Sequence, residues 1–143
     1  MVPEINEIQE RAYSNGMSFL LAAQTLMIPK PLTETTFQLP MGPAIVCYAF
    51  SIELFLKSIH LREGTSHRGH NLLDLFDALP PATKSLISRE FYNRFGMNEF
   101  NFRIKISEVK NIFNDFRYIH EKNNAYAELD FLRNFSDTIS KMK

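Results

Sequence analysis

The chain of 143 residues has one cysteine and no tryptophan, and its 16 acidic residues balance its 16 Lys and Arg residues. A single cysteine excludes an internal disulfide and a thiolate metal cluster. Because Cys47 lies in an apolar stretch, we predict a buried, unreactive thiol. A formal net charge of zero argues against a protein that holds nucleic acid by its overall charge. Any such contact must come from a local basic patch.

The sequence also shows no pattern of a secretory signal peptide or of a transmembrane helix. Residues 1–4 contain no basic segment followed by an apolar core, which a secretory signal would have. The longest apolar run, 41–56, contains Ser51 and Glu53 and is shorter than the ~18–20 residues of a transmembrane helix. We therefore expect a cytoplasmic protein without a membrane partner.

Strand-like alternation is absent, whereas apolar residues recur with a helical period through most of the chain. Residues 29–43 hold four of the seven prolines and predict an extended, irregular connector, and residues 96–102 predict a loop. The pattern predicts a first helix from Ile5 to near Pro29, a second from Pro43 to about Arg62, a short third one capped by Asn71 through Leu79, and a fourth over 82–95.

Two further helices are predicted in the last part of the chain. The fifth is capped by Ser107, and its inward residues are Val109, Ile112, Phe113 and Phe116. The last helix follows Asn123 and Asn124, and its apolar stripe consists of Leu129, Leu132, Phe135, Ile139 and Met142.

These patterns predict one all-α domain over residues 1–143, an up-and-down bundle of about five to six helices. The helix that begins near Pro43 is apolar on almost every side through Phe50, so we place it at the centre of the bundle. Phe91, Phe95 and Phe102 belong to a Phe-rich run for which core packing is favoured over base stacking.

The late segment around Arg117 holds the first candidate for chemistry. Arg117, His120 and Glu121 stand at positions i, i+3 and i+4, so a helix places them on one side. Arg neutralises charge on phosphoryl oxygens, and His transfers protons near neutral pH. The alternative is an ordinary polar helix end.

A second candidate lies around the end of the central helix. Glu53 and Lys57 are four residues apart, which predicts an intrahelical ion pair, and in the functional interpretation Lys57 also lines a polar cleft beside His60. The loop that follows concentrates Arg62, His67, Arg68 and His70, which suit a local phosphate site or a solvated connector equally. His67 and His70 lack carboxylates at metal-ligand spacing, so we expect no metal and no cofactor.

Three segments in order resemble the HEPN family of small helical domains: SIELFLK at 51–57, GHNLLDLF at 69–76 and FRYIHE at 116–121. The resemblance covers about residues 40–140. It implies an all-α bundle that pairs as a symmetric homodimer, a context of prokaryotic defence or toxin–antitoxin systems and, in active members, metal-independent RNA cleavage by an Arg and a His late in the domain.

Only two residues separate Arg117 from His120 here, fewer than in active members, and Arg117, Tyr118 and Glu121 look like the Arg-Tyr-x-x-Glu branch of the family. We therefore favour an RNA- or nucleotide-binding regulatory module, with Glu53, Lys57, His70, Tyr118 and Glu121 binding or supporting the site. The alternative is a ribonuclease toxin with Arg117 and His120 as catalytic residues at a dimer cleft. The expected partners are a second copy, an RNA or nucleotide ligand, and a cognate antitoxin or regulatory protein.

Overall fold

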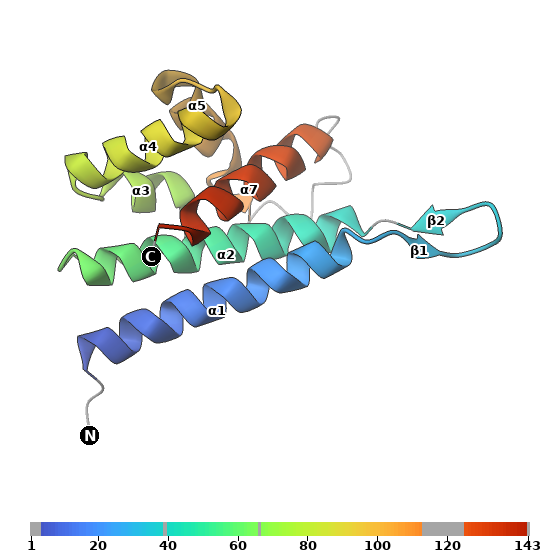
Figure 1. The fold of residues 1–143 in the computed structure, drawn as a ribbon, viewed down its shortest axis with the longest axis horizontal. Coiled ribbons are helices and arrows are strands. Elements are labelled where there is room, and N and C mark those ends of the chain that lie inside the picture. The colour runs from blue at the N-terminus through green and yellow to red at the C-terminus, as the bar shows by residue number, and fades with distance from the viewer. Residues whose placement is uncertain (1–3, 39, 66, 113–124, 143) are drawn as a thin grey trace.

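The structure, a computed structural model, describes residues 4–38, 40–65, 67–112 and 125–142. Its elements are α1 (Ile5–Leu26), β1 (Lys30–Pro31), β2 (Phe37–Gln38), α2 (Met41–Arg62), α3 (Leu72–Asp77), α4 (Pro81–Phe95), α5 (Glu99–Val109) and α7 (Ala125–Ser140). The predicted all-α helical bundle is confirmed. Helices α1 and α2 run antiparallel, side by side, while α3, α4, α5 and α7 lie on the other side of α2 (Figure 1).

Helix α2 is central because it presents apolar residues on every side. It packs against α1, α3 and α7, and its fully buried residues include Ile45, Ile52 and Leu56. By length and composition it is apolar enough to cross a membrane, but 67% of its most apolar window is buried within the bundle, and core helices meet the same criterion. Cys47 is half-buried on α2 rather than fully buried, and burial raises the pKa of its thiol above the usual range.

The connector after α1 is partly a hairpin, which the prediction of an irregular segment missed. Lys30 pairs with Gln38 and Pro31 with Phe37 in an antiparallel register. The Thr33 hydroxyl accepts the backbone N–H of Thr36 at 3.1 Å and so closes the turn. The hairpin projects from one end of the bundle, beyond α1 and α2 (Figure 1).

Three helix boundaries differ from the prediction. Helix α2 begins at Met41, so Pro43 lies within its first turn, where backbone N–H groups have no intrahelical partner and proline is tolerated. Asn71 caps α3 as predicted, because its side chain accepts the Asp74 N–H at 3.0 Å, but α3 ends at Asp77. Helix α4 includes Pro81 as its first residue.

The loop predicted at 96–102 is present only at 96–98, and the prediction that Ser107 caps the next helix was wrong. Helix α5 begins at Glu99, because the Asn98 side chain accepts the Asn101 N–H at 2.8 Å. Ser107 lies inside α5, whose buried stripe is Phe102, Ile106 and Val109. The inward positions predicted for Val109 and Ile112 are confirmed, whereas Phe113 and Phe116 lie outside the described residues.

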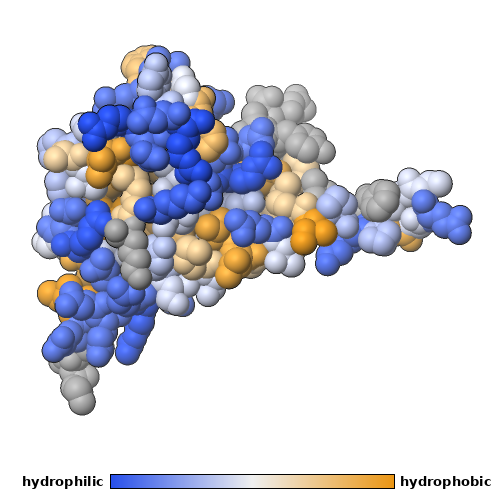
Figure 2. Space-filling model, viewed as in Figure 1, coloured by the Kyte–Doolittle hydropathy of each residue, from blue (hydrophilic) through white to orange (hydrophobic). Residues whose placement is uncertain are grey.

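The core also follows the predicted stripe of the last helix. Leu129, Leu132, Phe135 and Ile139 of α7 are buried. Phe91 of α4 stacks on Phe102 of α5 with the ring centroids 4.6 Å apart, so these two rings serve packing. On the face seen in Figure 2 the surface is mostly hydrophilic, with apolar patches along α1. The exposed apolar residues of α1 are Ile5, Ile8 and Leu21.

Candidate functional site

A buried carboxylate on the central helix holds two basic side chains at the surface. The Glu53 side chain is only 5% exposed, whereas those of Lys57 and His70 are 29% and 70% exposed. Lys57 Nζ donates to Glu53 Oε2 at 3.2 Å, and His70 Nδ1 lies 3.0 Å and 3.1 Å from the two carboxylate oxygens. The i,i+4 pair predicted from sequence is therefore present, and His70 joins it from 17 residues further along the chain.

The carboxylate determines which ring nitrogen of His70 acts as the hydrogen-bond donor. Because an ionised carboxylate only accepts, Nδ1 of His70 carries a hydrogen in this geometry. Gly69 allows the approach, since its φ of +117° lies in a region that favours glycine and lets the loop turn back toward α2. The arrangement fixes the orientation of a titratable ring beside a lysine ammonium group.

His60, one turn beyond Lys57, attaches the basic loop to the bundle. It is buried, its Nε2 donates to the Leu75 carbonyl at 2.8 Å, and its Nδ1 lies 2.7 Å from the Thr65 hydroxyl. The carbonyl can only accept, so Nε2 bears the hydrogen. His60 thus anchors the start of the loop and positions α3 against α2.

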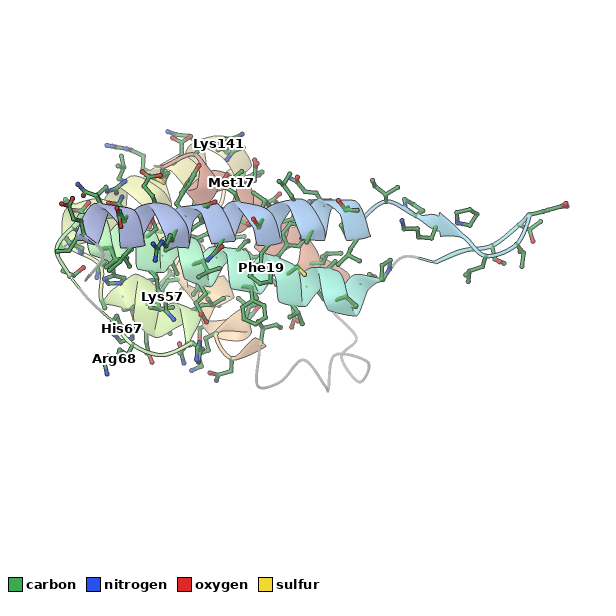
Figure 3. The ribbon with its side chains drawn as sticks, turned by 90° about the horizontal axis from the view of Figure 1, so that it is seen from below. Met17, Phe19, Lys57, His67, Arg68 and Lys141 are labelled. Carbon is green, nitrogen blue, oxygen red and sulfur yellow. The ribbon has the colours of Figure 1, made fainter. Side chains whose placement is uncertain are left out.

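A hollow of about 160 Å³ opens beside this anchor. It is lined by Lys57, His60, Leu61, Thr65 and His67. The rings of His60 and His67 stack with centroids 6.1 Å apart, which places His67 on the wall of the hollow. Lys57, His67 and Arg68 lie on the same side of the molecule, at the end of α2 and in the loop that follows it (Figure 3). The site therefore gathers several basic groups around one buried carboxylate.

Not every predicted residue belongs to this site. Arg62 turns toward the C-terminal end instead, where it donates to the Met142 carbonyl at 2.8 Å and contacts Glu63 at 3.3 Å. The predicted residues Arg117, Tyr118, His120 and Glu121 lie outside the described residues. Thr65, which sequence reasoning missed, has no recognisable signal because its role depends on the position of His60.

The start of α3 contacts the residues that come directly after α5. Asn71 Nδ2 donates to the Asn111 side chain at 3.3 Å, and the Leu72 N–H donates to the Lys110 carbonyl at 3.1 Å. Residues 110 and 111 therefore lie next to the residue that follows His70. Within the parts of the chain that the structure describes, no three His, Cys, Asp or Glu side chains gather as a set of metal ligands.

No family model matches the chain, and no curated protein and no solved structure matches it. The fold and the site define an all-α helical bundle with a buried glutamate that orients a lysine and a histidine beside a basic loop.

Proposed function

We propose that the chain is a HEPN-like domain that acts as an RNA- or nucleotide-binding regulatory module in a defence or toxin–antitoxin context. The observation that carries the proposal is the pair of contacts from buried Glu53 to Lys57 and His70. A buried charge is costly unless it is paired, and here the pairing holds a half-buried lysine and an exposed histidine in one place. Phosphate recognition requires such fixed donors.

The distribution of charge also supports phosphate binding at this place. The whole chain has no net charge, yet Lys57, His67 and Arg68 lie on one side of the molecule, where Glu53 pairs with Lys57 and His70. A local positive patch attracts a phosphate group without a basic protein around it. The family resemblance adds Arg117, Tyr118 and Glu121 as further binding residues of the same module.

We also propose a homodimer, with a cognate antitoxin or regulatory protein as a further partner. Exposed apolar side chains of α1 support self-association, among them Ile5 and Leu21. Symmetric pairing is the commonest way for a small domain to cover such side chains.

Replacing Glu53 tests whether binding depends on overall charge or on the orientation of Lys57 and His70, because the two explanations predict opposite changes in affinity. Replacing Glu53 by Gln raises the net charge by one, and binding driven by overall charge would then become tighter. If Glu53 orients Lys57 and His70, the same replacement weakens binding of a labelled single-stranded RNA or a nucleotide. The matched control is Glu108→Gln, which removes the same charge from a surface pair with Lys105 at 3.2 Å. Equal or tighter binding by Glu53→Gln, with the fold intact by circular dichroism, contradicts the proposal.

The second candidate is a metal-independent ribonuclease with Arg117 and His120 at a dimer cleft. The contact between His70 and Glu53 favours it, because a carboxylate that orients an imidazole is typical of acid–base sites. Pure protein is incubated with mixed RNA, with and without chelator, beside the Arg117→Ala/His120→Ala double variant. If the chain is a ribonuclease, we expect the wild type to cleave RNA with or without chelator and the double variant to leave the RNA intact. Intact RNA in every sample contradicts it.

A further inference from the structure

A second hollow, of about 290 Å³, lies among α1, α2, α4 and α7. Its polar wall includes Tyr48, Arg94, Arg133 and Asp137, and its apolar wall includes Leu20 and Phe95. Lys141, which contacts Asp137 at 3.4 Å, lies on the opposite side of the molecule from Lys57, His67 and Arg68 (Figure 3). The hollow is therefore distinct from the site around Glu53.

Tyr48 is the feature that points to a ligand. Tyr48 is only 1% exposed, yet among the described residues its hydroxyl has no hydrogen-bond partner. The hydroxyl is not a fully enclosed atom but opens to the hollow, where a ligand can supply the hydrogen-bond partner that tyrosine hydroxyls normally have. Burial raises the pKa of Tyr48, and the nearby charges of Arg133 and Asp137 also act on it. The phenol is therefore neutral near pH 7, and its hydroxyl is a donor in the hollow that Arg133 and Asp137 also line.

The two arginines of the hollow have different partners. Arg94 is engaged, because it donates to Asp137 at 2.5 Å and to the Thr138 hydroxyl at 3.0 Å. Among the described residues, Arg133 forms an ion pair with Asp130, three residues earlier on α7, and the two side chains are 48% and 65% exposed. Exposed pairs of this kind contribute little free energy, so Arg133 can turn to a ligand at little cost. A bound anion would then neutralise the Arg133 guanidinium, whose pair with Asp130 contributes little to the stability of the fold.

We propose that this hollow binds a small organic acid. Its carboxylate accepts hydrogen bonds from the Tyr48 hydroxyl and from the Arg133 guanidinium, and its apolar part lies along Leu20 and Phe95. The volume is close to the lower end of the usual ligand sites, which restricts the ligand to a small molecule. This inference goes beyond the proposed function, since it uses other residues and another ligand.

The test uses benzoate as the probe and benzamide as its neutral isostere, with the full chain titrated in a calorimeter. We expect the wild type to bind benzoate with a dissociation constant of about 1 mM or tighter. Tyr48→Phe keeps the buried ring and removes only the hydroxyl, and Arg133→Gln removes the exposed charge. Each is expected to weaken benzoate binding about ten-fold, the usual effect of losing a hydrogen bond to a charged group. Benzamide is expected to bind at least as weakly as benzoate binds to Arg133→Gln.

The matched control is Arg103→Gln, because Arg103 is an exposed arginine on α5 that donates to Asp77 and lies outside the hollow. It is expected to leave the benzoate affinity unchanged. Absence of benzoate binding by the wild type overturns the proposal. Unchanged affinity in Tyr48→Phe, or equal affinity for benzoate and benzamide, overturns it as well. None of these results depends on RNA binding, so the two proposals fail separately.

Discussion

At the scale of single residues, buried polar groups decide how the helices meet. The Ser51 and Ser136 hydroxyls lie 2.5 Å apart between α2 and α7, and Ser51 also donates to the Tyr48 carbonyl at 2.7 Å. Tyr13 of α1 donates to the Ser140 carbonyl at 2.8 Å. These hydrogen bonds compensate the loss of water around buried polar groups and fix the register of α1, α2 and α7.

Gly16 tests how closely α1 and α2 approach each other. A Cβ atom at Gly16 would lie 2.8 Å from ring atoms of Phe55, which is buried and packs at a tilt against the Tyr13 ring. We expect Gly16→Ala to lower the free energy of unfolding by about 1–2 kcal/mol, because overpacking outweighs the better helix propensity of alanine. Urea denaturation measures the change.

Gly42 provides the control for that substitution. It also lies in a helix, but a Cβ atom there would have no neighbour within 4 Å. Gly42→Ala is therefore expected to leave stability unchanged or to raise it by up to about 1 kcal/mol. Equal effects of the two substitutions would show that the contact with Phe55 is not tight.

Asp137 gives the bundle a dependence on acid pH. Burial alone would raise the pKa of Asp137, but the hydrogen bond and charge of Arg94, together with Lys141, hold that pKa below its usual value. A carboxyl group with a lowered folded-state pKa stabilises the fold above its unfolded pKa, and the contribution is lost as pH falls through the folded pKa. Urea denaturation between pH 7 and pH 3 should show a shallower loss of stability on the acid side for Asp137→Asn than for the wild type. Parallel curves would contradict this account.

At the scale of elements, α5 is a helix whose start could have been predicted from the sequence but was missed. The stripe of Phe102, Ile106 and Val109 has a helical period, and Asn98 is a good cap, so the signal was present. Gly96 and the polar residues after it resemble a loop, which masked that signal. The hairpin at 30–38 has strands of two residues, too short to show any alternation.

Phe102 and Phe100 form a matched pair on α5. Phe102 is fully buried against Phe91, whereas Phe100 is 73% exposed. We expect Phe102→Ala to lower the free energy of unfolding by about 3–5 kcal/mol, because it leaves a cavity among packed rings. Phe100→Ala is expected to change it by less than about 0.5 kcal/mol. A loop at this place, as predicted from sequence, would make the two losses similar, and denaturation by urea distinguishes the cases.

At the scale of the whole molecule, the sequence predicted the all-α bundle and the central place of α2, because long amphipathic and apolar stripes determine both. It predicted the contact between Glu53 and Lys57, since four residues along a helix fix that geometry. It did not predict that His70 reaches the same carboxylate, or that Tyr48 and Arg133 line one hollow. Those contacts depend on how loops and helices pack in three dimensions, which no spacing in the chain records.

The proposed homodimer is a property of the whole molecule and has a direct test. Exposed apolar side chains on α1, such as Ile5 and Leu21, support pairing of two copies. Static light scattering at micromolar concentration is expected to give twice the mass of 16.6 kDa. A mass equal to one chain over the whole concentration range would contradict the homodimer.

Lys57 provides the most direct test of the central claim that the oriented basic cluster beside Glu53 binds phosphate. The measurement is the affinity for a labelled single-stranded RNA at several salt concentrations, compared between the wild type, Lys57→Gln and the surface control Lys105→Gln. For each of the three proteins, the slope of log affinity against log salt concentration is measured over a range in which RNA binding is detectable. The account predicts weaker binding by Lys57→Gln and a log–log salt slope reduced by about 0.7, the value for one lost phosphate contact on a single strand. Lys105→Gln, which removes the same charge from a surface pair, should keep the wild-type slope. Identical affinities and slopes for Lys57→Gln and Lys105→Gln would contradict the account.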